Sequence, residues 1–143
     1  MDNLEELLVE ILTKAHSRII FNEERILKDM MGETLSIKEF HTLEIIYSTK
    51  ASKTNTAGNI ASRLGITLGT CTTNIDRLVA KGLVHKVKND QDRRVVYIDL
   101  TEKGVQIHMK HISLHKKLIT NAISRLSMTE KVALMNAVNK MEI

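Results

Sequence analysis

The chain has 143 residues, 43% of them hydrophobic and 27% charged, with a formal net charge of +4; this size and composition fit one folded domain rather than a disordered segment. It contains no Pro or Trp and only two Phe and two Tyr, so long uninterrupted helices are favoured over a β-sandwich. A single Cys cannot form an internal disulfide, no apolar run approaches the ~18 residues of a membrane span, and the N-terminus is acidic, so we expect a cytoplasmic protein without a membrane partner.

The first predicted element is a long amphipathic helix over residues 3–31. A helix of this length presents more apolar surface than the rest of a 143-residue chain covers. The excess apolar stripe therefore indicates a partner chain. Its apolar residues recur at steps of three and four, and they are Leu4, Leu7, Leu8, Ile11, Leu12, Ala15, Ile19, Ile20, Leu27 and Met30.

The next two predicted helices are marked by their N-caps. Ser36-Ile37-Lys38-Glu39 is a capping box that begins a second helix, which runs to about Ser48. A polar linker, residues 50–55, follows, and Thr56 is the expected N-cap of a short third helix. The residues of the second helix that we expect to face inward are Phe40, Leu43, Ile46 and Tyr47.

A helix-turn-helix is predicted around Gly65. This glycine is the expected left-handed residue after the third helix, and Ile66 fills the corner. Thr67 caps a fourth helix, 68 to about 80, which stops at Gly82. Two short helices joined through a glycine and a buried aliphatic residue are typical of this motif.

The last predicted elements are a β-ribbon and two helices. Leu83–Lys88 and Val95–Leu100 are rich in β-forming residues and flank the polar turn Asn89–Arg94. Thr101 caps a fifth helix that extends to about Arg125. A second capping box, Ser127-Met128-Thr129-Glu130, opens a sixth helix to the C-terminus.

The segment that contains this motif and ribbon is positively charged, as are residues 105–143, which hold six bases and two acids. Residues 53–104 hold nine bases and five acids, whereas residues 1–52 hold ten acids and six bases, and a surface that faces phosphates is expected to be basic. In the fourth helix Cys71, Ile75 and Leu78 share one face and should pack inward.

Small and hydroxyl-bearing residues on the opposite face suit entry into a DNA major groove, and the helix N-terminus itself favours phosphate. Gly69 costs about 1 kcal/mol of helix stability relative to Ala, which fits a position close to DNA. The alternative is an ordinary solvated helix face. The predicted DNA-contacting residues of the helices are Thr56, Thr67, Gly69, Thr70, Thr72, Thr73, Asn74 and Arg77.

The ribbon supplies a second group of predicted DNA contacts: Lys88, Asp92, Arg93 and Arg94. An Arg side chain can reach into a narrow minor groove, where the potential is most negative. Asp92 cannot itself attract phosphate, so we expect it to hold an Arg side chain through a charge-assisted hydrogen bond. The alternative is a charged hairpin without a partner.

These segments resemble the winged-helix core of the MarR family of bacterial transcriptional regulators. The resemblance implies one mainly α domain over residues 1–143 with a small β-wing: a winged helix-turn-helix over about 36–101 and dimerisation helices over about 3–31 and 102–143. It also implies a homodimer that binds a pseudo-palindromic double-stranded operator. Because the sequence has no glycine-rich phosphate loop, no Ser/His/Asp spacing and no paired-carboxylate motif, we expect neither enzymatic activity nor a cofactor. The motifs that carry it are Thr56–Gly65, Ile66-Thr67-x-x-Thr70, Asp76-Arg77-Leu78, Lys81-Gly82-Leu83-Val84, Asp92-Arg93-Arg94 and Leu100-Thr101-Glu102-Lys103-Gly104.

A narrower resemblance, carried by residues 36–42, 67–73 and 90–96, is to a subgroup of this family that represses fatty-acid-synthesis genes. It implies a repressor whose corepressor is long-chain acyl–acyl carrier protein. The acyl chain would occupy an apolar tunnel between the first, second and fifth helices. The candidate ligand-binding residues are Ile20, Glu24, His41, Ile45, His108 and Ile112.

Two other hypotheses stay open at this point. One is a zinc-responsive regulator, because some relatives bind zinc through His residues of the fifth helix; the residues available are Glu24, His41, His108 and His111, while Ile112 takes the place of one ligand. His111 and His115 also share a helix face. The alternative is that these His side chains bind no metal and are solvated or hydrogen-bonded.

The other is a helical dimerisation module whose partner is a protein. For Cys71 we expect the behaviour of a small buried hydrophobe rather than that of a redox switch.

Overall fold

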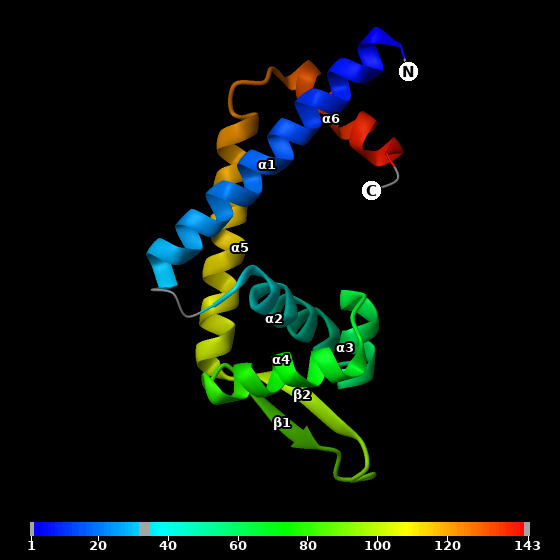
Figure 1. Ribbon diagram of the computed structural model, residues 1–143, viewed down its shortest axis with the longest axis vertical. Coiled ribbons are helices and arrows are strands. Elements are labelled where there is room, and N and C mark those ends of the chain that lie inside the picture. The colour runs from blue at the N-terminus through cyan, green and yellow to red at the C-terminus, as the bar shows by residue number, and fades with distance from the viewer. Residues whose placement is uncertain (1, 32–34, 142–143) are drawn as a thin grey trace. The chain divides into compact units, whose positions relative to one another are not determined.

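The computed structural model of the protein describes residues 2–31 and 35–141, and its fold is mainly α with one two-stranded antiparallel sheet, as predicted (Figure 1). The chain divides into two compact units, residues 1–109 and 110–143, and each is described by itself. In chain order the elements are α1 (Asn3–Met31), α2 (Ile37–Lys50), α3 (Ala57–Leu64), α4 (Leu68–Ala80), β1 (Val84–Lys88), β2 (Val96–Leu100), α5 (Glu102–Ile123) and α6 (Met128–Lys140).

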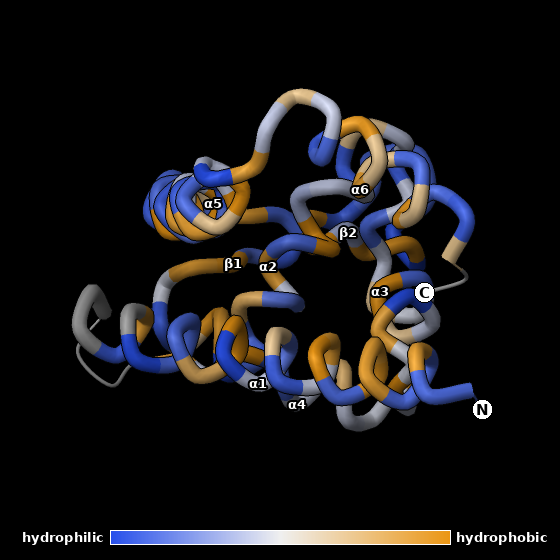
Figure 2. Tube along the Cα trace, turned by 90° about the horizontal axis from the view of Figure 1, so that it is seen from above, coloured by the Kyte–Doolittle hydropathy of each residue, from blue (hydrophilic) through white to orange (hydrophobic). Residues whose placement is uncertain are grey.

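Helix α1 has the predicted length and an exposed apolar face. Glu5 and Glu6 lie in its first turn and Lys28 in its last, which suits the helix dipole. Figure 2 shows hydrophobic and hydrophilic residues alternating along it. Leu27 is buried. The large apolar side chains of α1 that are exposed, by 37–64% in the single chain, are Leu4, Leu7, Leu8, Val9, Ile11, Leu12, Ile19, Ile20 and Phe21.

Helices α2, α3 and α4 pack together with β2 around the core of the first unit. The predicted capping box is present, since Ser36 Oγ accepts from the Glu39 N–H and the Glu39 carboxylate accepts from the Ser36 N–H. Gly65 has the expected left-handed conformation, with φ +65°. The core residues contributed by these four elements include Phe40, Leu43, Ile46, Ile60, Ala61, Cys71, Ile75, Leu78, Ile98 and Leu100.

Tyr47 corrects one expectation, because its side chain is 41% exposed rather than directed inward. The buried stripe of α2 advances in steps of three through Phe40, Leu43 and Ile46. Tyr47 lies about 100° further round the helix than Ile46 and therefore falls at the rim of that stripe. Its ring packs on His108, with 4.5 Å between ring centroids.

The linker after α2 closes the helix with a lysine in a conformation that glycine usually adopts. The Lys53 N–H donates to the Lys50 carbonyl (3.0 Å) and the Thr54 N–H donates to the Thr49 carbonyl (3.1 Å), which is the Schellman pattern. Lys53 has φ +54°, and among the described residues it is the only non-glycine with a positive φ. For an L-residue with a β-carbon this conformation costs roughly 1 kcal/mol.

The β-ribbon is joined to the linker before α3. β1 and β2 pair antiparallel from Val84↔Leu100 to Lys88↔Val96. On the other edge of β2, the Ile98 N–H donates to the Asn55 carbonyl and the Asn55 side-chain amide donates to the Ile98 carbonyl, each at 2.7 Å. An isolated bridge between Thr56 and Tyr97 extends this pairing, so β2 has neighbours on both sides.

Both strands begin one residue later than predicted, for separate reasons. The Leu83 N–H donates to the Leu78 carbonyl and thereby completes the end of α4, with Gly82 at φ +72°. The Val95 N–H donates to the Asp92 carbonyl and so belongs to the turn.

The second unit contains most of α5 and all of α6. Ser127 and Glu130 form the second predicted capping box. No helix in the described residues combines the length and the apolarity that a membrane crossing requires. The last two residues of the predicted C-terminal dimerisation segment lie outside the described residues. Large apolar side chains of α6 are 45–75% exposed, and they are Met128, Val132, Leu134, Met135 and Val138.

Gly104 is required where α5 begins, and this generates a stability prediction. A β-carbon at this position would lie 2.0 Å from the Leu83 carbonyl oxygen, a backbone atom that cannot move aside. We expect Gly104→Ala to lower the free energy of unfolding by about 1–3 kcal/mol, as overpacking does. The measurement is urea unfolding followed by circular dichroism.

Gly58→Ala in α3 is the matched control. No atom lies within 4 Å of a β-carbon placed there, so alanine should stabilise this helix by up to about 1 kcal/mol. Equal stability of the Gly104→Ala variant and the wild type would contradict the proposed close approach.

Candidate nucleic-acid interface

Helix α4 presents one buried and one exposed face. Cys71, Ile75 and Leu78 are 0–1% exposed and fix the helix on the core, as predicted. Thr67 caps its N-terminus: Thr67 Oγ1 accepts from the Thr70 N–H (3.2 Å) and donates to Thr70 Oγ1 (2.9 Å). The predicted contact residues on the other side are exposed, except Asn74, which is half-buried; the exposed ones are Thr67, Gly69, Thr70, Thr72, Thr73 and Arg77.

The threonine hydroxyls of this exposed face are oriented by the helix itself. Thr72 donates to the Leu68 carbonyl (2.9 Å) and Thr73 donates to the Gly69 carbonyl (3.0 Å). With their hydrogens engaged, these oxygens still accept hydrogen bonds. Amino groups on base edges in a major groove are suitable donors.

Gly69 has no role in packing within the chain. A β-carbon built there meets no atom within 4 Å, and its φ is not positive. Alanine would therefore fit the fold and favour the helix. The fold itself therefore does not require glycine at this exposed position near the helix N-terminus.

The tip of the ribbon holds Arg94 in a defined position. Asp92 Oδ1 accepts hydrogen bonds from the Arg94 backbone N–H (3.0 Å) and from Arg94 Nε (3.2 Å). The Arg94 side chain is nevertheless 92% exposed, so its remaining N–H groups point to solvent. The predicted Asp92–Arg contact is therefore present, and the Arg that it orients is Arg94. Arg93 and Lys88 are also exposed.

Two ion pairs connect α4 with its neighbours. Lys86 of β1 pairs with Asp76 of α4 at 2.7 Å. Lys81, at the C-terminus of α4, pairs with Glu39 at the N-terminus of α2, also at 2.7 Å. Burial of Glu39 opposes its ionisation, but hydrogen bonds from Lys81 and Ser36 and the Lys81 charge outweigh it and lower the Glu39 pKa. The pair thus anchors the exposed helix to the core.

The predicted ligand residues of the first unit are not all gathered at one hollow. Glu24 lines a hollow of about 470 Å³ together with Leu27, Lys28 and residues 35–38. His41 is exposed and Ile45 half-buried, whereas Ile20 is 37% exposed. His108 is buried against Tyr47. None of these last four lines that hollow among the described residues.

The remaining candidates lie in the second unit or in the core. Ile112 is 44% exposed. His111 Nε2 and His115 Nε2 lie 2.9 Å apart, so the two rings do share a helix face. Cys71 is fully buried, and burial raises its thiol pKa. The protonated, inaccessible thiol fits a packing role rather than a redox switch.

Sequence reasoning missed the residues that hold the interface together. The sequence places Asn55 in a polar linker with no motif of its own, and it identifies Glu39 only as a helix-capping residue. Neither position carries a local signal for its long-range partner, because Ile98 and Lys81 are each more than forty residues away. An Asn directly before a capping Thr was the available hint.

A short helix-turn-helix with an exposed threonine face, followed by an arginine-tipped ribbon fixed to the same core, defines a winged helix-turn-helix DNA-binding protein. Comparison with known proteins identifies its family. A family model described as the MarR family matches residues 35–96. YkoM, an uncharacterized HTH-type transcriptional regulator of Bacillus subtilis, is 32% identical over 108 residues, which cover 76% of this chain and 68% of YkoM.

Solved structures agree over the length of the chain. The crystal structure of Streptococcus pneumoniae FabT in complex with DNA is 33% identical, with a TM-score of 0.83, over 94% of this chain and 92% of that one. A mutant of S. aureus MepR has the same fold at 21% identity, with a TM-score of 0.80, over 93% and 94% of the two chains. The chain belongs to the MarR family and is a DNA-binding transcriptional regulator, not an enzyme.

The Glu39–Lys81 pair makes stability depend on pH in a defined direction. Because the folded-state pKa of Glu39 lies below its ordinary value of 4.5, the pair stabilises the protein above that pH, and the contribution is lost as the pH falls through the lower pKa. Glu39→Gln keeps the capping hydrogen bond and removes the charge. We expect it to reduce the unfolding free energy at pH 7 by about 1 kcal/mol, allowing for solvent screening around the partly exposed Lys81.

Urea unfolding at several pH values between 3 and 7 measures this. The difference between the variant and the wild type should shrink toward pH 3. A difference that stays constant over the range would assign the effect to packing.

Proposed function

We propose that this protein is a homodimeric repressor that binds a pseudo-palindromic operator. In each subunit α4 enters a major groove and the Arg94 tip enters the flanking minor groove, with Thr56, Thr67, Gly69, Thr70, Thr72, Thr73, Asn74, Arg77, Lys88 and Arg93 as the other contacts. The observation that carries the proposal is Arg94, held by Asp92 yet 92% exposed, on a ribbon fixed to the core that carries α4.

The exposed apolar faces of α1 and α6 support the homodimer. In the single chain, side chains such as Leu4 (63% exposed), Leu8 (48%) and Met135 (56%) remain in contact with water. Burying apolar surface contributes about 25 cal/mol per Å², so two long faces of this kind favour association. A second copy of the chain has the same faces and allows a symmetric interface.

The regulated genes are proposed to be those of fatty-acid synthesis. This rests on 33% identity to FabT of S. pneumoniae over nearly the whole chain, whose crystal structure contains DNA, and on the segments 36–42, 67–73 and 90–96 of the sequence. The corepressor is proposed to be long-chain acyl–acyl carrier protein. It would act by binding more tightly to the dimer conformation in which the two winged helix-turn-helix regions fit the operator.

Arg94→Ala tests the DNA-binding mode. Loss of a minor-groove Arg in each subunit should weaken operator binding about tenfold or more and reduce the dependence of affinity on salt. The melting temperature should be unchanged, because the side chain is exposed and its ion pair is on the surface. Fluorescence anisotropy with an operator duplex between 50 and 300 mM salt gives both quantities.

The matched control is Arg125→Ala, which removes an equal charge from the turn between α5 and α6, a segment that belongs to neither the helix-turn-helix nor the ribbon. It should bind like the wild type. Undiminished binding by a folded Arg94→Ala variant would refute the role given to the ribbon tip.

Titration with acyl–acyl carrier protein tests the corepressor. In a mobility-shift assay, long-chain acyl–acyl carrier protein should tighten operator binding, whereas free carrier protein and short-chain forms should not. The titration is carried out with and without a chelator, so that an effect of metal is recognised separately. If no chain length changes the affinity, the lipid proposal is discarded and DNA binding stands unaffected.

A further inference from the structure

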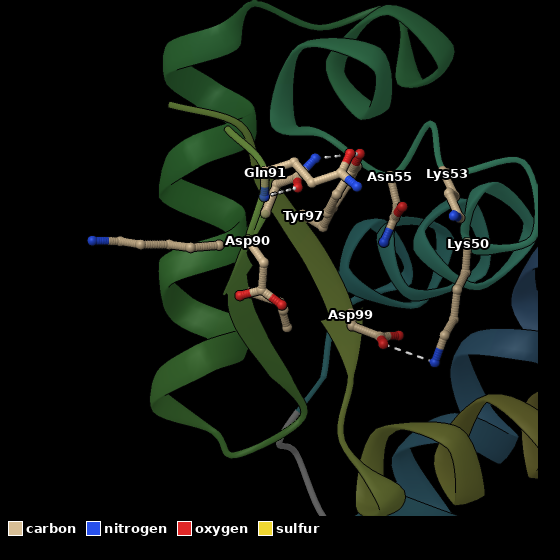
Figure 3. Close-up of a pocket in the computed structure, with 10 residues that line it drawn as sticks. Lys50, Lys53, Asn55, Asp90, Gln91, Tyr97 and Asp99 are labelled. Carbon is tan, nitrogen blue, oxygen red and sulfur yellow. Dashed lines mark hydrogen bonds and ion pairs between the residues drawn. The ribbon is translucent and has the colours of Figure 1, made fainter. Parts of the chain in front are cut away.

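The ribbon has a hollow on the face that is turned away from α4. The hollow measures about 610 Å³ and lies between the linker after α2 and the ribbon (Figure 3). Figure 3 shows Lys50, Lys53 and Asn55 coming from the linker side, with Tyr97 and Asp99 on β2 opposite them. The residues that line it are Lys50, Lys53, Asn55, Val87, Lys88, Asn89, Asp90, Gln91, Tyr97 and Asp99.

Strand alternation explains why this is the outer face. Paired residues of antiparallel strands point to the same side, and successive residues point to opposite sides. Val96 and Ile98 of β2 line a smaller hollow of about 210 Å³ with Thr72 and Ile75 of α4. Tyr97, between them, must face the other way, and it lines the larger hollow.

The charges of the outer hollow are only partly neutralised. Lys50 pairs with Asp99 at 2.7 Å. Neither Lys53 nor Lys88 forms an ion pair with any described residue, and Asp90 is the other acid of the lining. Lys53 therefore keeps an unpaired positive charge on the linker side of this concave surface. Lys88 pairs with Val96, so its side chain points to the α4 side of the ribbon.

Lys53 occupies its position against a backbone preference. Its φ of +54° is the glycine position of the Schellman motif that ends α2. A glycine would meet every backbone requirement of that motif. A lysine can interact favourably with the helix dipole, but Lys50 already lies in the last turn of α2. The fold therefore does not require the exposed amine of Lys53, which is available to bind another molecule.

We propose that Lys53 binds a backbone phosphate of the DNA on the far side of the minor groove that receives the ribbon tip. With α4 in the major groove, the inner face of the ribbon meets the phosphates shared by the two grooves. The outer face then meets the phosphates beyond the tip, and the interface extends past the ribbon. This inference rests on the DNA-binding mode described under the proposed function.

Three variants of Lys53 separate its charge from its backbone. Lys53→Met removes the charge and keeps a β-carbon, so the backbone strain is the same. Lys53→Arg keeps both the charge and the strain. Lys53→Gly removes both. Operator affinity is measured for all three by fluorescence anisotropy between 50 and 300 mM salt, and melting temperature by circular dichroism.

We expect Lys53→Met and Lys53→Gly to bind about fivefold more weakly, with the slope of log affinity against log salt reduced by about one for each Lys53 engaged. Lys53→Arg should bind like the wild type. Lys53→Gly should melt no lower than the wild type while binding more weakly. Such a combination is not produced by a residue that serves only the fold.

A second experiment varies the length of the duplex. On a duplex that ends at the minor groove bound by the ribbon tip, Lys53→Met should equal the wild type; the difference should return when about five base pairs are added at each end. Equal binding of Lys53→Met and wild type on the longer duplex overturns the inference.

The results for Arg94→Ala and Lys53→Met together distinguish failure of the outer-face contact from failure of the whole DNA-binding mode. If Arg94→Ala weakens binding and Lys53→Met does not, only the outer-face contact is wrong. If neither weakens binding, the proposed mode fails as a whole. If inorganic phosphate raises the melting temperature of the wild type but not of Lys53→Met, and DNA affinity is the same for both, the hollow binds a free anion and the inference is overturned.

Discussion

The exchange of two hydrogen bonds between Asn55 and Ile98 is the constraint on which the interface depends. Both bonds are 2.7 Å long and join residues 43 apart in sequence. Asn55 directly precedes the N-cap of α3, and Ile98 lies in the middle of β2, so one buried contact fixes the ribbon to the helix-turn-helix. Because Asn55 is 5% exposed, water does not compete for these bonds. These bonds thereby fix the position of the ribbon tip relative to α4. A protein that contacts a duplex through both elements requires such a fixed arrangement.

The acids of the basic segment act as positioning partners. Asp92 orients Arg94, Asp76 pairs with Lys86, and Asp99 pairs with Lys50. Each pairing neutralises or directs a base near the interface. Since exposed pairs of this kind add little to stability, their main effect is on where positive charge remains available. That charge is left on Arg94 at the tip, on Arg77, Arg93 and Lys88, and on Lys53 of the outer hollow.

The glycines show how the fold and an external partner can be distinguished. Gly65 and Gly82 have left-handed φ values that close α3 and α4, and Gly104 lies against the Leu83 carbonyl. Gly69 meets neither condition, although it lowers the helix propensity of α4. Lys53 is the converse case, a side chain at a backbone position where glycine fits better. Both departures from local preference lie in the segment that we assign to DNA, which is where such conflicts are expected.

The sequence by itself determined the elements, because their signals are local. Capping boxes at Ser36 and Ser127, the threonine caps and the glycine stops place helix ends to within about two residues, and the three- and four-residue spacing in α4 identifies its buried face. Tyr47 was misplaced because its position at the rim of the buried stripe depends on neighbouring elements. The joining of β2 to Asn55, the pairing of Glu39 with Lys81 and the left-handed Lys53 were decided by tertiary structure. The first two contacts connect residues that are distant in sequence, and the Lys53 conformation arises where the chain turns after α2. No pattern of neighbouring residues specifies them.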